Sequence, residues 1–244
     1  MGGRTASRRT GLDRATVAAT ALTLLDDVGL DGLTVRRLAA ELGVQSPALY
    51  WHFRDKQELL DLMAQELQAA LPLAPRRDDE PWPQWVARRA RERRRLLLSR
   101  RDGARLVAGT AAGPAIALQA EAELRTLADA GFSPVQALRA ITAIGHYTTG
   151  FVMEEQSAGQ RRRPPEGPTA PEAPDGPPPD AGATPTLMAA IRDGGPPEGD
   201  EAFEQGLWML IDGMRALLER SAAGAAPDGA PGSERRTRTS PPAR

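Results

Sequence analysis

TVRRLAAELGVQSPALYWHFRDKQELL, residues 34–60, holds two short helical patterns separated by a turn that contains a glycine. Gly43 stands where the first helix must end, and Ser46 followed by Pro47 is a typical start for the second. A short glycine-containing turn between two short helices is the signature of a helix-turn-helix unit. The spacing therefore predicts a DNA-binding unit. An ordinary helical hairpin with the aromatic cluster 50–53 in its core would show the same spacing.

The rest of the chain has the same helical character. Apolar residues recur at helical intervals, and no run shows the period-two alternation of a half-buried strand. Helices are expected over residues 13–28, 34–42, 46–52, 55–71, 84–100, 114–130, 134–156 and 201–220, with a short one over 186–193. We therefore expect an all-α protein.

The prolines divide the chain into folded and unfolded parts. Eleven of the 22 prolines lie between residues 157 and 200, among few large apolar side chains. Such a stretch cannot bury enough surface to offset the entropy of ordering it. The expected organisation is a disordered basic arm (1–12), a helix-turn-helix domain (13–56), a larger helical domain (57–221) with a Pro-rich disordered insert at about 157–184, and a disordered tail (222–244).

Composition excludes several classes of site. The 31 basic and 32 acidic residues nearly cancel, cysteine is absent, and the two histidines stand at positions 52 and 146. Disulfides and thiolate chemistry are excluded, and a zinc site made of protein ligands is disfavoured. Glu154 and Glu155 are adjacent, so they point to different helix faces and make a poor catalytic pair. With no long apolar segment, we expect a cytoplasmic protein that is neither an enzyme nor bound to a membrane.

Residues 34–60 also resemble the DNA-binding domain of the TetR-type transcriptional regulators. LLLSRRDGARLVAGT (96–110), GFSPVQALRAITAIGHYTTGFVMEEQ (131–156) and the sequence around 201–218 resemble the effector domain of the tetracycline repressor branch. The resemblance implies a repressor that binds a palindromic operator in double-stranded DNA as a homodimer and is released by a small-molecule effector. A DNA-binding protein that needs no ligand, and a repressor that responds to tetracycline with magnesium, are the alternatives.

The resemblance assigns DNA-contacting roles to eight residues. Arg36 matches an arginine that reaches a base, and a guanidinium can bond O6 and N7 of guanine together. Ser46, Pro47 and Ala48 open the recognition helix, where side chains meet base edges. Contacts to phosphates are implied for Thr34, Tyr50, His52 and Lys56. Arg4, Arg8 and Arg9 in the basic arm either add contacts or are solvated.

Two long helices are the expected dimer contact. The helices over 134–156 and 201–220 are apolar over more of their circumference than a helix on the surface of a monomer needs. In the family that the chain resembles, the equivalent helices of two subunits form a four-helix bundle. The alternative is that both helices only complete the core of one subunit.

The resemblance also outlines an effector pocket, with differences at its centre. Val107 stands where the family has a metal-coordinating histidine, and valine cannot bind a metal. Thr110 and Glu154 match a threonine and an acidic residue near that metal, and His146 either lines the pocket or lies hydrogen-bonded in the interior. We therefore expect a small-molecule effector other than tetracycline with magnesium, and no cofactor or metal.

Arg89 and Arg93 replace an asparagine and a phenylalanine that contact the drug in the resembled family. An arginine that points inward is costly unless it is paired. Three arrangements are open at this point. The two arginines pair with Glu154 or another acid, await an anionic ligand such as a carboxylate, or belong to a solvated surface on which their stems lie.

Overall fold

The computed structural model describes residues 12–71, 75–110, 113–162 and 183–224, and within these ranges every regular element is a helix. The all-α prediction is confirmed for this part of the chain. The helices are α1 (Arg14–Gly32), α2 (Val35–Glu41), α3 (Ser46–Leu49), α4 (Lys56–Ala69), α5 (Trp82–Leu98), α6 (Gly103–Ala108), α7 (Pro114–Asp129), α8 (Pro134–Arg162), α9 (Pro185–Gly194) and α10 (Asp200–Gly224). The predicted basic arm, and most of the predicted insert and tail, lie outside the described residues.

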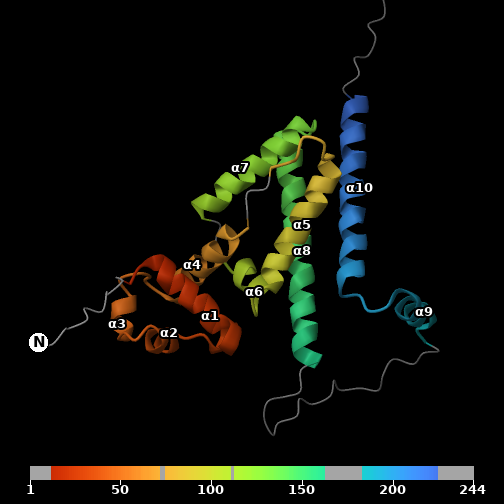
Figure 1. The fold of residues 1–244 in the computed structure, drawn as a ribbon. Coiled ribbons are helices and arrows are strands. Elements are labelled where there is room, and N and C mark those ends of the chain that lie inside the picture. The colour runs from red at the N-terminus through yellow and green to blue at the C-terminus, as the bar shows by residue number, and fades with distance from the viewer. Residues whose placement is uncertain (1–11, 72–74, 111–112, 163–182, 225–244) are drawn as a thin grey trace, which may run out of the picture.

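Helices α1 to α4 pack around one apolar core and form the N-terminal head (Figure 1). Leu25 of α1, Leu38 of α2 and Leu49 of α3 are all fully buried there, together with Leu59 and Met63 of α4. α4 packs along α1 and leads away from the head toward the rest of the molecule. One helix therefore belongs to the head core at its start and to the larger body at its end.

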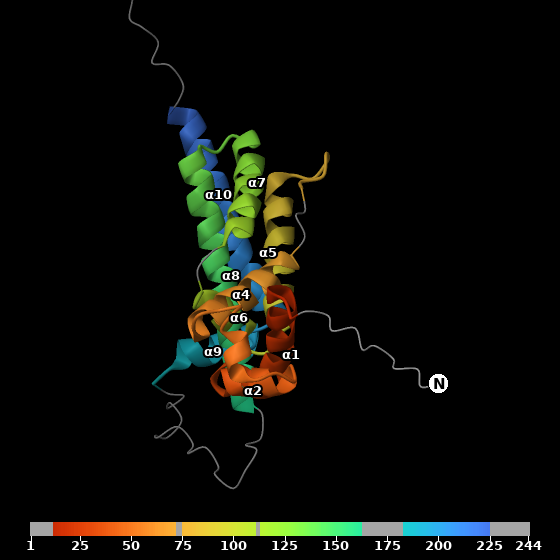
Figure 2. The ribbon, with the colours of Figure 1, turned by 90° about the vertical axis from the view of Figure 1, so that its left-hand side faces the viewer.

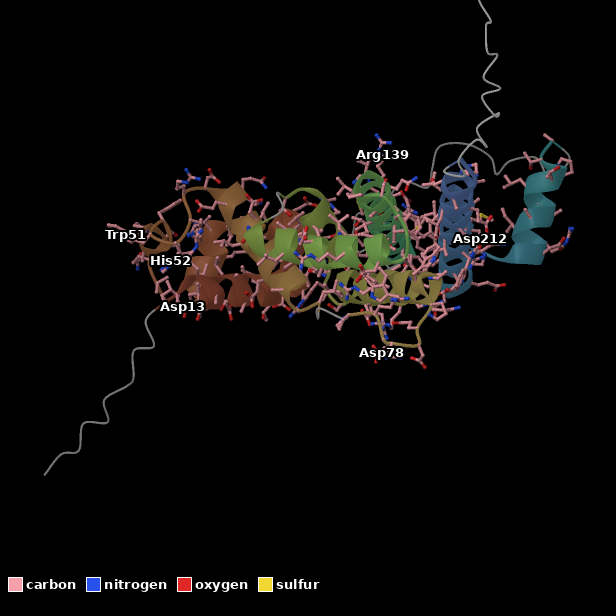
Figure 3. All side chains as sticks on the ribbon, turned by 90° about the horizontal axis from the view of Figure 1, so that it is seen from above. Asp13, Trp51, His52, Asp78, Arg139 and Asp212 are labelled. Atoms are coloured by element: carbon pink, nitrogen blue, oxygen red, sulfur yellow. The ribbon has the colours of Figure 1, made fainter. Side chains whose placement is uncertain are left out.

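Helices α5, α7, α8 and α10 make up a second body with its own core (Figures 1 and 2). α8 packs against α5, α7 and α10, and the buried side chains between them include Trp85, Phe132, Phe203, Leu207 and Ile211. α9 lies beyond α10, on the side of the molecule away from the head (Figures 1 and 3). Its apolar residues Leu187, Met188 and Ile191 are exposed.

Several helix ends differ from the sequence prediction. α8 continues to Arg162 and α10 to Gly224, so the first residues assigned to the insert and the tail are helical. Gly29 ends the regular helix that begins at Arg14, as the sequence predicts: its φ of 69° is not helical, and a further helical segment runs from there to Gly32. A Cβ on Gly29 would meet Asp102 Oδ2 and Arg101 Nε at 3.1 Å. The α5–α6 loop therefore approaches Gly29 closely, a contact that local sequence does not predict.

Asp102 holds the head to the second body. The side chain is 4% exposed, and its Oδ2 accepts a hydrogen bond from the backbone N–H of Leu30 in α1 at 2.8 Å. Its Oδ1 accepts from Gln160 Nε2 in α8 at 2.9 Å. Asp102 itself has φ of 56°, a left-handed conformation that aspartate tolerates better than most residues. One carboxylate thus joins α1, α6 and α8.

Further arginine–aspartate contacts around this junction join α1 to α6 and to the loop that precedes α6. The backbone N–H of Arg101 donates to Asp26 Oδ1, and its guanidinium donates to the carbonyl of Asp27. Arg105 of α6 forms two hydrogen bonds with the carboxylate of Asp31, at 3.1 and 3.2 Å. These contacts are partly exposed and contribute less individually than the buried carboxylate.

We predict that Asp102→Ala lowers the free energy of unfolding by about 2–4 kcal/mol, because it leaves the Leu30 N–H without an acceptor and puts alanine in a left-handed conformation. Urea unfolding followed by circular dichroism, at one fixed protein concentration, measures the loss. Asp193→Ala is the matched control, since that exposed carboxylate pairs only with its neighbour Arg192. A loss for Asp102→Ala as small as that of the control would contradict the role of this junction.

Candidate functional site

The turn between α2 and α3 places the second short helix at an outer end of the head. Gly43 has φ of 66°, a conformation that side chains other than glycine rarely adopt, and no atom lies near enough to oppose a Cβ there. The Val44 N–H donates to the carbonyl of Ala39 at 3.0 Å and closes the turn. Leu49 and Phe53 are buried, which anchors α3 to the head from below. The predicted helix-turn-helix geometry is therefore present.

The outward face of this unit carries the residues to which the sequence assigned DNA contacts. Arg36, Pro47, Tyr50, Lys56 and Thr34 are exposed, and Ser46, Ala48 and His52 are half-buried. Thr34 has a structural task as well, because its hydroxyl caps α2 by accepting from the Arg37 N–H. The aromatic cluster is divided: Phe53 lies in the core, while Tyr50 points outward.

Trp51 is 90% exposed and lies beside His52 at the extreme end of the head (Figure 3). No assigned DNA contact included it, although an indole without packing partners at this position is a strong sign of an interaction surface. Arg36 forms no hydrogen bond or ion pair within the described part of the chain, whereas the adjacent Arg37 donates to the carbonyl of Gly32. The guanidinium of Arg36 is thus available to a partner.

A cavity of about 690 Å³ lies in the second body. Residues of α4, α5, α6, α7 and α8 line it, together with one residue of α10. This volume is in the range of pockets that hold small molecules. Most of the wall is apolar and includes Trp85, Val86, Ile116, Leu127, Ile144 and Met153. The C-terminal end of α4 contributes Gln68, so the cavity touches the helix that continues from the head.

Five of the six predicted pocket residues line this cavity. They are Arg89, Arg93, Val107, Thr110 and His146. Thr110 donates its hydroxyl to the Val107 carbonyl at 3.1 Å, and His146 is exposed rather than interior. Glu154 is exposed on α8 and is not among the residues that line this cavity. Its neighbour Glu155 instead pairs with Arg94.

Arg89 is buried, 7% exposed, and fully engaged with acids. Its Nε and Nη2 donate to Oε1 of Glu123 at 3.1 and 2.8 Å, and its Nη1 donates to Glu92 Oε2 at 2.9 Å. Sequence reasoning missed Glu123, which lies on α7 and 34 residues away. Nothing in the sequence around Glu123 indicated that it would pair with Arg89. The pairing gives the buried Arg89 guanidinium two carboxylate acceptors inside the wall.

Arg93 also lines the cavity, one helical turn further along α5, but is held differently. Its Nε is buried without any hydrogen-bond partner in the described structure. Its Nη2 makes one long contact, 3.4 Å, with the hydroxyl of Thr149. Burial lowers the pKa of the Arg93 guanidinium, the charge of Glu123 opposes that shift, and the positive charge of Arg89 adds to it. Arg93 is therefore a half-buried cation whose shielded Nε has no acceptor and which forms no ion pair within the described residues.

The other arginines of α5 that are not exposed all pair with acids. Arg88 pairs with Glu80 at 2.8 Å, and its hydrogen bonds lower the pKa of Glu80 to about 2. Arg91 pairs with Glu204 at 2.6 Å. Arg94 pairs with Glu155 and with Asp200. Most arginines of α5 thus form ion pairs with other elements, and Arg95 is the exposed exception among the described residues.

The described residues contain no group of three or more histidine, aspartate or glutamate side chains arranged to hold a metal ion. None of their helices combines the length and the apolar character needed to cross a membrane.

Two family models match most of the chain. The model described as "Bacterial regulatory proteins, tetR family" matches residues 11–63, and "Tetracyclin repressor-like, C-terminal domain" matches residues 74–218. The first covers the head and the start of α4. The second covers α5 to α8 and most of α10, and therefore the cavity.

Individual relatives agree over nearly their whole length. The tetracycline repressor protein class A from transposon 1721 of Escherichia coli is 44% identical over 226 residues, covering 88% of this chain and 97% of the relative. A structure described as a possible TetR family regulator from Streptomyces coelicolor A3(2) has a TM-score of 0.71 at 37% identity, covering 84% of this chain and 100% of that one.

A third relative was solved with a ligand. The structure of TetR (class A) with 5a,6-anhydrotetracycline and magnesium has a TM-score of 0.63 at 37% identity, covering 84% of this chain and 99% of that one. Helical head, larger helical body and sequence thus agree with the same set of regulators. The chain belongs to the TetR family of bacterial regulatory proteins, with a tetracycline-repressor-like C-terminal domain.

Proposed function

We propose that this chain is a cytoplasmic repressor that binds a palindromic operator as a homodimer and leaves it when a small molecule enters the cavity. The observation that carries the proposal is the course of α4. This helix packs in the core of the helix-turn-helix head and ends at the cavity wall with Gln68. A ligand-independent DNA-binding protein would have no need of a cavity of about 690 Å³ at that place. Family membership supports a regulator over an enzyme.

The proposed DNA surface combines base and phosphate contacts. Arg36, with Ser46, Pro47 and Ala48, is proposed to meet base edges in the major groove. Thr34, Tyr50, His52 and Lys56 are proposed to contact phosphates and so to fix the position of the head without reading sequence. We add Trp51, since its exposed ring lies on the same end of the head.

Selection of bound sequences from a random DNA library, with the purified full chain, tests the function. We expect an inverted repeat, because two heads related by a two-fold axis read the same half-site in opposite directions. Enrichment of single half-sites, or no enrichment, would contradict a dimeric, sequence-specific repressor.

Arg36→Ala should weaken binding to the selected operator by about 5- to 100-fold, the loss of a bidentate guanine contact, and weaken binding to unrelated DNA much less. Fluorescence anisotropy at one salt concentration measures both affinities. Arg125→Ala, which removes an exposed arginine from α7, is the control and should change neither. Equal losses on both DNAs for Arg36→Ala would make Arg36 a phosphate contact.

The proposed dimer surface lies on α8 and α10. Val135 and Leu138 on α8 are more than half exposed, and Met209 on α10 is 66% exposed. Large apolar side chains at such exposure, on two adjacent helices whose other faces are buried, are typical of a contact between subunits. The two-fold contact would pair α8 and α10 of one chain with the same helices of a second.

Light scattering coupled to size exclusion is expected to give about 52 kDa, twice the 26.1 kDa of one chain. The double variant Leu138→Glu, Met209→Glu should elute as a monomer, because four carboxylates would be buried without partners. Leu98→Glu, on the exposed end of α5, is the control and should remain dimeric. A dimer that survives the double variant would place the contact elsewhere.

A change at the cavity would reach the head through α6 and its hydrogen bond with α4. α6 contributes Val107 and Ala108 to the wall, and the carbonyl of Gly109 accepts from Gln57 Nε2 of α4 at 3.0 Å. A ligand that displaces the end of α6 therefore pulls on the start of α4, next to α3. In a dimer this changes the spacing of the two heads, so that ligand and operator weaken each other reciprocally.

We propose that the effector is not tetracycline with magnesium. The cavity wall has valine at position 107, and the carboxylate of Glu123 is already bonded by Arg89. Two guanidinium groups also line the wall, and they repel a cation.

A further inference from the structure

Arg93 lines the cavity with a guanidinium whose donors are poorly matched by the protein. Its Nε is shielded and bonds no acceptor, and its Nη2 makes the long contact with Thr149, although a guanidinium carries five N–H donors and no acceptor atom. A shielded donor without an acceptor is costly, because its desolvation is not offset by a hydrogen bond. A ligand in the cavity can bring both an acceptor and an opposite charge to the guanidinium.

The acids near Arg93 are bonded to other arginines. Glu123 of α7 and Glu92 of α5 both accept from Arg89, and Glu92 also accepts from Arg88. α8 contributes the uncharged hydroxyl of Thr149 and the exposed His146. Among the charged residues that line the cavity there are two arginines and one glutamate, and that glutamate is bonded by Arg89.

We propose that the effector is an organic monoanion: one oxyanion group, such as a carboxylate or sulfonate, on an apolar body. The Arg93 guanidinium binds the oxyanion through two parallel N–H donors, and Thr149 adds a hydroxyl. The apolar wall, with Trp85, Ile144 and Met153, receives the rest of the molecule. The inference rests on the proposed function, since it names the chemical class that the proposed sensor detects.

Arg89 and Arg93 have different tasks in this arrangement. The ion pair of Arg89 with Glu123 joins α5 to α7. Removing Arg89 therefore leaves Glu123 without its main partner in the cavity wall. Arg93 has no such dependent acid. The two residues, four positions apart on one helix, therefore give opposite expectations for the stability of the unliganded protein.

A pair of fluorescent probes tests the charge requirement directly. 8-Anilinonaphthalene-1-sulfonate carries one sulfonate, and N-phenyl-1-naphthylamine has the same ring system without it. Titration of the full chain, without DNA, is expected to give tighter binding for the sulfonate. Arg93→Met should weaken sulfonate binding by at least about tenfold, as expected for loss of a desolvated charge contact. The neutral probe should bind Arg93→Met as well as wild type.

Two further variants control this measurement. Arg93→Lys keeps the positive charge and should retain most of the preference for the sulfonate. Arg95→Met makes the same change at an exposed arginine on the same helix and should alter neither affinity. Equal binding of the two probes by the wild type, or equal weakening of both by Arg93→Met, would overturn the anion site.

Thermal unfolding gives a readout that does not depend on any probe. Arg93→Met should raise Tm of the unliganded protein by a few degrees, because it removes a partly desolvated charge that has no ion pair and a shielded N–H that has no acceptor. Arg89→Met should lower Tm. A lowered Tm for Arg93→Met would mean that Arg93 is needed by the fold itself and would contradict the inference.

Operator binding separates this inference from the proposed function. If the wild type selects an inverted repeat but shows no preference for the sulfonate, the anion site is wrong and the repressor stands. If no inverted repeat is selected, the proposed function fails whichever probe binds. The two sets of measurements use the same full chain and share no assay.

Discussion

The buried carboxylate of Asp102 is the constraint on which the relation between head and body depends. It accepts hydrogen bonds from Leu30 in the head and from Gln160 in α8, and it begins the turn into α6. The same six-residue helix ends at the cavity with Val107 and Ala108. The element that orients the head is therefore also an element that a ligand touches. A rigid junction of this kind transmits displacement, whereas a flexible linker between the two bodies would absorb it.

Arginine side chains fix α5 in the second body. Lys56 is the one lysine in a chain with 31 basic residues, so nearly every basic side chain ends in a planar guanidinium group. A guanidinium can donate two parallel hydrogen bonds to one carboxylate, which fixes the orientation of the pair as well as its distance. Arg88, Arg91 and Arg94 each use this geometry to reach an acid. The nearly zero net charge of the chain thus conceals a dense set of pairs, from which Arg93 is missing.

Local patterns were sufficient to predict the helix-turn-helix. Ser46, Pro47 and Gly43 act through their own backbone, so their positions in the sequence predict the turn and the second helix. The contacts of the Asp102 loop with Gly29 and with Gln160 of α8 join residues that lie far apart along the chain, so local patterns do not predict them. The cavity shows the same limit. Helical periodicity placed Arg89 and Arg93 near an apolar stripe, but the choice among ion pair, ligand and solvent required Glu123, which only the folded chain brings near.

An unpaired charge in the cavity wall changes what a ligand has to supply. A pocket whose polar groups were all satisfied would gain only apolar contact from an occupant, and apolar contact discriminates weakly among molecules of similar size. With Arg93 unsatisfied, an occupant that brings an oxyanion relieves a cost already present in the free protein, and a neutral molecule of the same shape does not. The selectivity for an oxyanion then comes from the free-energy cost that Arg93 carries while the cavity is empty. Thr149 on α8 and Arg93 on α5 would both bind the anion. Binding would therefore draw these two helices of the cavity wall together.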